Sequence, residues 1–239
     1  NLAIAFRWLL CSAWRELECD IEKLGELEAK KKRKIAAIEP ALKAFNCGCY
    51  AAANILGQML DDAEIPREYK INFTRATSQE YFEEASKGGY VFAKNQLYSI
   101  WTTRAESETN QEKKSRYFEK AFSYLKESAD LCEPWACNKY ADSYLIKIHK
   151  NYDDAFKYFI DAYNLGVDNT KEWAAANIIK YYMSGLNQTD DKIACLLSAN
   201  SSFYAELLEV CRRSKDKNIK DIFDNCVAKG VNINDWLFW

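Results

Sequence analysis

An asparagine recurs at nearly regular intervals along this chain, and it constrains the fold more than any other feature. The four copies are Asn54, Asn95, Asn138 and Asn177, which are 41, 43 and 39 residues apart. Each follows a short run rich in alanine or aromatic residues, as in Tyr50-Ala-Ala-Ala-Asn54. Self-similarity at a period of this length is typical of repeat proteins, in which one helical unit stacks on the next. The spacing therefore predicts an α-solenoid.

The composition agrees with an all-α protein. Among 239 residues there are only 8 Gly and 3 Pro, too few for the many tight turns of an all-β fold. Lys, Glu and Ala, which favour helices, are spread along the whole chain. The net charge of −2 gives no general reason to expect binding to nucleic acid.

Residues 1–39 are expected to form a long N-terminal helical segment that resembles a coiled coil. Its apolar residues keep a 4-3 spacing: Leu10, Trp14, Leu17, Ile21, Leu24, Ile35 and Ile38. The pattern favours packing of this seam on the first repeat, and self-association through residues 1–38 is the alternative. Pro40 is expected to end this helix or to start the next one.

Residues 40–186 are expected to hold about four helix-turn-helix repeats. In each unit a first helix carries aromatic beside small residues, a glycine marks the turn, and a second helix carries the asparagine. The turn glycines are Gly48, Gly88, Gly89 and Gly166. Thr77-Ser-Gln-Glu80 predicts a helix start through a capping box, and Asn169-Thr-Lys-Glu172 predicts a weaker one.

Residues 187–239 are expected to form a helical C-terminal cap. Helices are predicted from Thr189 to Leu197, from Phe203 to Arg213 and from Asn218 to Ala228, with Gly230 as the last stop. The apolar stripe that would cover the open end of the stack is Ile219, Ile222, Phe223 and Val227. The apolar ending up to Trp239 is expected to fold back on this cap, with contact to a partner as the alternative.

The repeat region resembles the Sel1-like repeats, which are related to the tetratricopeptide repeats. The segment from Asn54-Ile-Leu-Gly to Pro66-Arg-Glu-Tyr69 is similar to the family's Asn-Leu-Gly run followed by its Val-Pro-Lys-Asp-Tyr loop. Lys150-Asn-Tyr-Asp-Asp-Ala155 is similar to the start of a unit, and Tyr182-Met-Ser-Gly185 to the end of a second helix. The units are longer than the family's, and the extra length is expected in loops at 103–115 and 167–170.

The resemblance implies a non-enzymatic scaffold or adaptor that binds another protein or peptide. In such stacks the first helices line the concave surface. Helical phase places six candidate partner-binding residues there: Lys43, Glu84, Lys126, Glu127, Lys157 and Asp161. Ordinary solvated surface is the alternative interpretation of each.

No catalytic, cofactor-binding or metal-binding residues are predicted. The close cysteine pairs, Cys47-Gly-Cys49 and Cys132-x4-Cys137, lack the two-residue gap of zinc knuckles and ribbons. His149 is the only histidine and is expected in a loop between repeats. No glycine-rich phosphate loop occurs in the sequence. The basic run at 30–34 is interpreted as the solvated face of the first helix, balanced by the acids before it.

Nine scattered cysteines predict free thiols in a reducing compartment, so a cytoplasmic location is expected. The longest apolar stretch, residues 2–14, is too short to span a bilayer. Two other functions remain open. The chain could be the sensor or regulatory module of a larger protein, whose effector or DNA-binding domain lies upstream of Asn1. It could also be an oligomeric structural protein built through the N-terminal seam.

Overall fold

The computed structural model describes residues 26–183 and 201–228. Every regular element within these two ranges is helical, which confirms the prediction of an all-α protein. The chain divides into two compact units, residues 1–121 and 122–239, and each is described by itself. This division falls inside the expected repeat segment 40–186, within helix α7.

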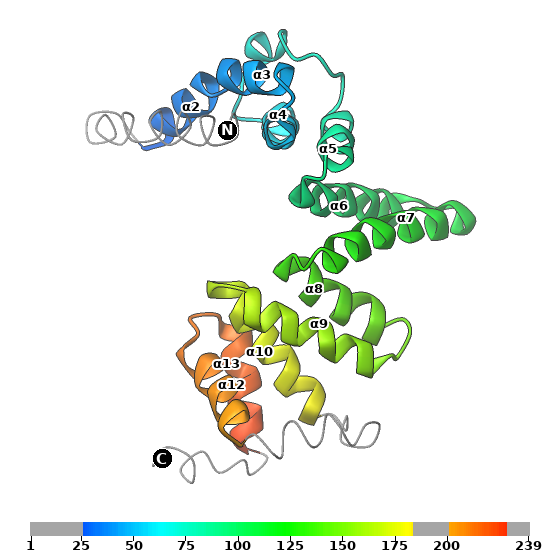
Figure 1. Ribbon diagram of the computed structural model, residues 1–239, viewed down its shortest axis with the longest axis vertical. Helices are drawn as coiled ribbons and strands as arrows, with labels where there is room; N and C mark the ends of the chain where they lie inside the picture. The colour runs from blue at the N-terminus through cyan, green and yellow to red at the C-terminus, as the bar shows by residue number, and fades with distance from the viewer. Residues whose placement is uncertain (1–25, 184–200, 229–239) are drawn as a thin grey trace. The chain divides into compact units, whose positions relative to one another are not determined.

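Unit 1 contains consecutive helices (Figure 1). They are α2 (Glu26–Ala36), α3 (Ile38–Asn46), α4 (Tyr50–Asp61), the 3₁₀ helix η1 (Arg67–Lys70), α5 (Ser78–Lys87), α6 (Val91–Ser107) and the first part of α7 (Gln111–Asp130). A longer connection over residues 62–77 joins α4 to α5. Helix α3 packs on α4, α4 on α5, and α5 on α6. Sequence neighbours are thus neighbours in space, as expected for helical hairpins.

Large side chains facing small ones set the close approach of the helices in unit 1. A Cβ atom added at Gly57 on α4 would lie 2.6 Å from the Phe82 ring of α5. One added at Gly88, after α5, would lie 1.9 Å from the ring of Tyr50. The rings therefore fill the space that a side chain at either glycine would need.

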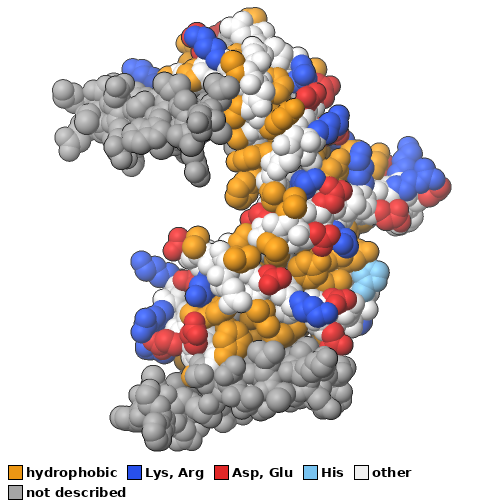
Figure 2. All heavy atoms as spheres, in the orientation of Figure 1, with side chains coloured by type: hydrophobic (Ala, Val, Ile, Leu, Met, Phe, Trp, Pro, Cys, Tyr) orange, Lys and Arg blue, Asp and Glu red, His pale blue; other side chains and the backbone are white. Residues whose placement is uncertain are grey.

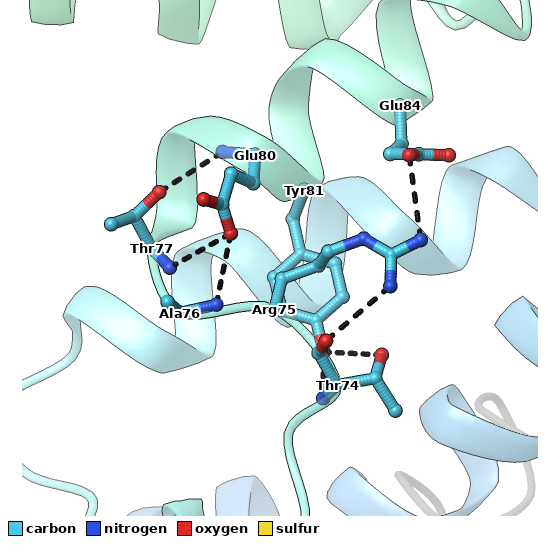
Figure 3. Close-up of polar contacts among 7 residues, drawn as sticks. All are labelled: Thr74, Arg75, Ala76, Thr77, Glu80, Tyr81 and Glu84. Carbon is cyan, nitrogen blue, oxygen red and sulfur yellow. Dashed lines mark hydrogen bonds and ion pairs between the residues drawn. The ribbon is translucent and has the colours of Figure 1, made fainter.

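Local signals in the sequence set the helix ends in unit 1. The Thr77 hydroxyl accepts from the Glu80 amide at 3.3 Å, while the Glu80 carboxylate accepts from the Thr77 amide. This capping box, drawn in Figure 3, begins α5 where the sequence predicts it. Gly48 and Gly89 have φ angles of +83° and +84°, which glycine adopts without the steric cost of a Cβ atom.

Unit 2 continues the succession of antiparallel helices. It holds the rest of α7, α8 (Pro134–Tyr140), the π-helix η2 (Ala141–Ile146), α9 (Tyr152–Leu165), α10 (Asp168–Met183), α12 (Ser201–Arg213) and α13 (Lys217–Ala228). Helix α9 packs against α8, η2 and α10, and α10 also contacts α8. Helices α12 and α13 lie against α10 and against each other, as Figure 1 shows. Helix α10 thus packs both on helices before it and on helices after it in the chain.

Side chains of α10 bond to side chains of α8 and η2 that lie 39 residues earlier in unit 2. The Asn177 amide on α10 donates to the Asn138 side-chain oxygen on α8 at 3.0 Å, across 39 residues. The Tyr181 hydroxyl donates to Asp142 of η2, again across 39 residues. The sequence suggests that the asparagines bond to the backbone of neighbouring helices. For this pair that interpretation is wrong, because the two side chains bond to each other.

Three boundaries differ from those expected. Residues 103–115 are mostly helical, because α6 continues to Ser107 and α7 starts at Gln111. Helix α10 already begins at Asp168, so 167–170 is not a loop and Asn169 is not a cap. Pro40 lies in the first turn of α3, which starts at Ile38 and crosses the expected boundary at 39/40.

The C-terminal helices α12 and α13 lie close to the two ranges predicted for them. Ile219 is fully buried, and Ile222 and Phe223 are half-buried. Most of the N-terminal seam, the helix from Thr189, the side chain of Val227, Gly230 and the ending at Trp239 lie outside the described residues. No described helix combines the length and the apolar character needed to cross a membrane.

Candidate functional site

In unit 1, one candidate residue joins a small cluster of rings and charges. Arg75 donates to the Glu84 carboxylate at 3.4 Å, as Figure 3 shows. The Arg75 guanidinium also lies 5.5 Å from the centre of the Phe45 ring. Phe45 packs edge-on against Tyr81, whose hydroxyl accepts from the Thr74 amide at 2.8 Å. Glu84 of α5 thus fixes the loop before its own helix.

Lys43, the other candidate in unit 1, lies on α3 with about three quarters of its side chain exposed. It pairs with Glu39 one helical turn earlier, at 2.7 Å. Such exposed pairs contribute little to stability, because solvent screens them. Lys43 is therefore available to a partner at little cost in stability, whereas Glu84 has a structural role already.

In unit 2, two first helices are joined by a shared carboxylate. The Lys126 ammonium lies 2.6 Å from Asp130 on the same helix, α7. The Tyr158 hydroxyl of α9 donates to the other oxygen of Asp130 at 2.7 Å. The structure therefore brings Lys126 beside α9, where two further candidate residues lie.

Those residues are Lys157 and Asp161 on α9. Lys157 is exposed and pairs with Asp154 at 2.9 Å, and the Asn151 amide holds the other Asp154 oxygen at the same distance. Asp161 is half-buried, and Glu127 is exposed on α7. Four of the six predicted residues thus belong to α7 and α9 of unit 2, while Lys43 and Glu84 belong to unit 1.

A group of aromatic rings beside these residues was not predicted from the sequence. We call it the aromatic cluster, and its members are Phe122, Tyr140, Tyr144, His149 and Tyr158. Tyr140 and Tyr144 are stacked at 5.1 Å with an interplanar angle of 16°. The i, i+4 spacing of these two tyrosines was the available signal, because it places both on one helix face.

The other three rings extend the cluster across helices. Phe122 of α7 lies 4.9 Å from Tyr144, and Tyr158 of α9 meets Tyr140 edge-on at 5.3 Å. His149, in the loop where the sequence places it, lies 4.3 Å from Tyr144. Figure 2 shows hydrophobic side chains gathered beside the single histidine.

Titratable groups in and beside the cluster have pKa values shifted from their ordinary ones. Burial opposes ionisation of Asp130, but hydrogen bonds from Lys126 and Tyr158 outweigh it and lower the pKa of the carboxyl. The same balance, with Lys147 and Tyr181 as donors, lowers the pKa of Asp142. Burial, followed by the neighbouring Tyr144 and then by the charges of Asp130 and Asp154, raises the pKa of Tyr140 to about 12. Both carboxylates are therefore charged, and the tyrosine is neutral, at neutral pH.

Cys137 of α8 behaves as a packing residue. The buried Cys137 thiol donates to the Ala129 carbonyl at 3.3 Å. Its burial raises its pKa to about 12, so it is a poor nucleophile. Among the described residues, no three His, Cys, Asp or Glu side chains lie close enough together to hold a metal ion.

In comparisons with known proteins, no protein-family model, no curated protein and no solved structure matches the chain.

Proposed function

We propose that the chain is a stack of divergent Sel1-like repeats that serves as a non-enzymatic scaffold or adaptor for another protein. The observation that carries the proposal is the pair of hydrogen bonds Asn177–Asn138 and Tyr181–Asp142. Both join residues 39 apart, and 39 is also the spacing of the last two asparagines in the sequence. Contacts between equivalent positions of successive units are what stacking of repeats requires.

Short turns and small core residues also support this proposal. The turn from α9 to α10 is Gly166-Val167, and the capped start at Asn151 follows the Lys150-Asn-Tyr-Asp-Asp motif of the resemblance. Buried alanines line the contacts between helices in unit 2: Ala129, Ala136, Ala141, Ala155, Ala162, Ala174, Ala175 and Ala176. Repeat stacks of this kind expose long, continuous surfaces, and such surfaces commonly bind proteins.

The first-helix surface of unit 2 is the part we assign to the partner. Its charged residues, Lys126, Asp130, Asp154 and Lys157, form ion pairs within one helix and are about half-exposed or more. A partner's charges can exchange with such pairs because each contributes little to stability. The buried thiol of Cys137 agrees with a reducing, cytoplasmic location, which we include in the proposal.

The test is recovery of a partner by the immobilised chain from an extract of its native source. The variant carries Lys126→Glu and Lys157→Glu, and the control carries Lys217→Glu on α13. All three lysines are exposed, so unfolding free energies should change by no more than about 0.5 kcal/mol per site. We expect the double variant to change the affinity for the recovered protein about tenfold, equivalent to about 1.4 kcal/mol.

Lys217→Glu should leave the recovery unchanged. Equal binding by all three proteins would contradict the assignment of this surface. A partner that is chemically converted by the chain would contradict the non-enzymatic function, and mass spectrometry of the partner before and after incubation detects this.

A further inference from the structure

The aromatic cluster of unit 2 lies where the second helix widens into a π-helix. The α-helical turn of α8 ends at Tyr140, and residues Ala141–Ile146 continue as η2. A π-helical turn contains an extra residue, and such turns occur frequently at functional sites. Tyr140 is the last residue of α8, and Tyr144, on which its ring stacks, lies within η2. The irregular geometry thus coincides with the aromatic cluster.

The cluster reaches the surface on one side. Phe122, Tyr144 and Tyr158 are half-buried and His149 is exposed, whereas Tyr140 is 4% exposed. Rings that are partly open and partly packed offer a rigid contact area at low entropic cost. Hydrophobic side chains are visible beside the histidine in Figure 2.

The hydroxyl of Tyr140 has no hydrogen-bond partner in the part of the chain that the structure describes. It belongs to a side chain that is more than nine-tenths buried. The hydroxyls of Tyr158 and Tyr181, by contrast, each donate to a carboxylate. The Tyr140 oxygen is not among the fully buried unpartnered atoms of the described residues, so it is open to a hydrogen bond from solvent or from a ligand.

Carboxylates lie near these rings, together with the lysines that pair with them. Asp130, Asp154 and Asp161 are three of these carboxylates. The charges of Asp130 and Asp154 act on Tyr140, and those of Asp130 and Asp161 act on Cys137 behind it. Lys126 and Lys157 balance two of these acids, but only through exposed pairs, which are weak.

We propose that the aromatic cluster, with Asp130 and Asp154 at its edge, binds the guanidinium group of an arginine on the protein partner. This deepens the proposed scaffold function and rests on it. Arginine fits because its planar group stacks on tyrosine rings while its N–H groups reach carboxylates. Its fork of donors can also donate to the Tyr140 hydroxyl oxygen in place of water. Lysine offers a single, strongly hydrated point charge and fits the stacked rings less well.

The experiment selects peptides from a randomised 12-residue display library on the full chain. The best binder is then synthesised with each arginine replaced in turn by citrulline, which has the same shape but no charge. We expect the selected peptides to contain arginine. We also expect one citrulline replacement to weaken binding about fivefold or more, measured by fluorescence polarisation. This comparison leaves the protein unchanged, so it does not depend on the folding of a variant.

Two protein variants locate the binding. Tyr144→Leu removes a ring and Asp154→Asn removes an edge charge, while Asp221→Asn on exposed α13 is the charge-matched control. Both cluster variants should weaken the arginine peptide about fivefold and leave the citrulline peptide unaffected. Unfolding transitions of all variants show whether any loss reflects misfolding.

Peptides without arginine, or peptides insensitive to citrulline, would overturn the inference while leaving peptide binding, and hence the scaffold function, in place. Binding that is equal in the two cluster variants and the control would also overturn it. Failure to select any peptide would overturn the arginine site, whereas the scaffold function is decided separately by recovery of the protein partner.

Discussion

At the scale of single residues, Asn138 and Asn177 join α8 to α10. Their side chains bond at 3.0 Å, and Asn177 is 6% exposed. Replacing either by alanine leaves the other without this partner. We expect Asn177→Ala to lower the free energy of unfolding by about 1 kcal/mol, the typical net value of such a bond. Urea unfolding measures it.

A double-mutant cycle separates the bond from other effects of the substitutions. The double variant Asn138→Ala, Asn177→Ala should be about 1 kcal/mol more stable than the sum of the single losses predicts. Strict additivity would mean that the two asparagines act independently, and the repeat contact would then lie elsewhere.

Asp142 gives a residue-scale prediction for pH. Burial opposes its ionisation, but hydrogen bonds from Lys147 and Tyr181 lower its pKa below the ordinary value of 3.8. A carboxyl with a depressed pKa in the folded state adds stability above its unfolded pKa, and this stability is lost as the pH falls through the folded value. Asp142→Asn should therefore be destabilising at pH 7, and the difference from the parent chain should shrink below about pH 4.

Urea unfolding between pH 7 and pH 2.5 measures this difference. Asp153→Asn, an exposed substitution on α9, is the control. It should change the free energy of unfolding little at any pH in this range. A destabilisation by Asp142→Asn that is constant over the whole range would show that the charge of Asp142 contributes nothing.

At the scale of elements, the start of α5 depends on one hydroxyl. Thr77 accepts from the Glu80 amide, which would otherwise lack a partner. Thr77→Ala should cost about 1 kcal/mol, and Thr77→Ser should retain most of the stability, because serine caps as well as threonine. Thermal unfolding followed by circular dichroism compares the variants. Equal losses for alanine and serine would contradict the role of the hydroxyl.

The turn after α5 depends on the small size of the residue at position 88. Gly88 has a φ angle of −78°, which any residue adopts, but the Tyr50 ring occupies the position of its missing side chain. Gly88→Ala should therefore destabilise the chain by about 1–3 kcal/mol through overpacking. Adding Tyr50→Ala should remove most of the extra loss caused by the alanine. A loss that is unchanged in the Tyr50→Ala background would indicate backbone strain instead.

Element ends also show where sequence reasoning succeeds and fails. The Thr77 cap and the turn glycines are local, so the sequence suffices to find them. Residues 103–115 contain many polar side chains and look like a loop. Thr103 and Ser107, however, donate to carbonyls of their own helix, at 3.0 and 3.1 Å. A polar residue that bonds back to its helix carries no sequence signal that distinguishes it from a loop residue.

The candidate site was predicted less well than the helices. Helical phase found Lys126, Lys157 and their neighbours on α7 and α9, but it missed the aromatic cluster. That cluster depends on the π-helix η2 and on rings from three separate elements. Tertiary packing determines both features, and no single-sequence pattern reports them.

At the scale of the whole molecule, contacts between neighbouring helices dominate the two units. In the proposed stack, stability is approximately a sum of unit and interface contributions. A destabilising substitution at one interface should therefore not unfold the whole chain in one step. The two units can accordingly differ in stability. We expect Gly88→Ala to lower the protection of unit 1 amides and to leave those of unit 2 nearly unchanged, measured by native-state hydrogen exchange. Equal loss of protection in both units would show that the chain unfolds as one cooperative body.

The central claim is that the first helices of unit 2 hold a protein partner. Hydrogen exchange of the chain with and without the recovered partner, read by mass spectrometry, tests it most directly. The account predicts slower exchange on binding in residues 122–130 and 152–161, and in the loop around His149, with α12 and α13 unaffected. Protection confined to α12 and α13, or to unit 1, would contradict it.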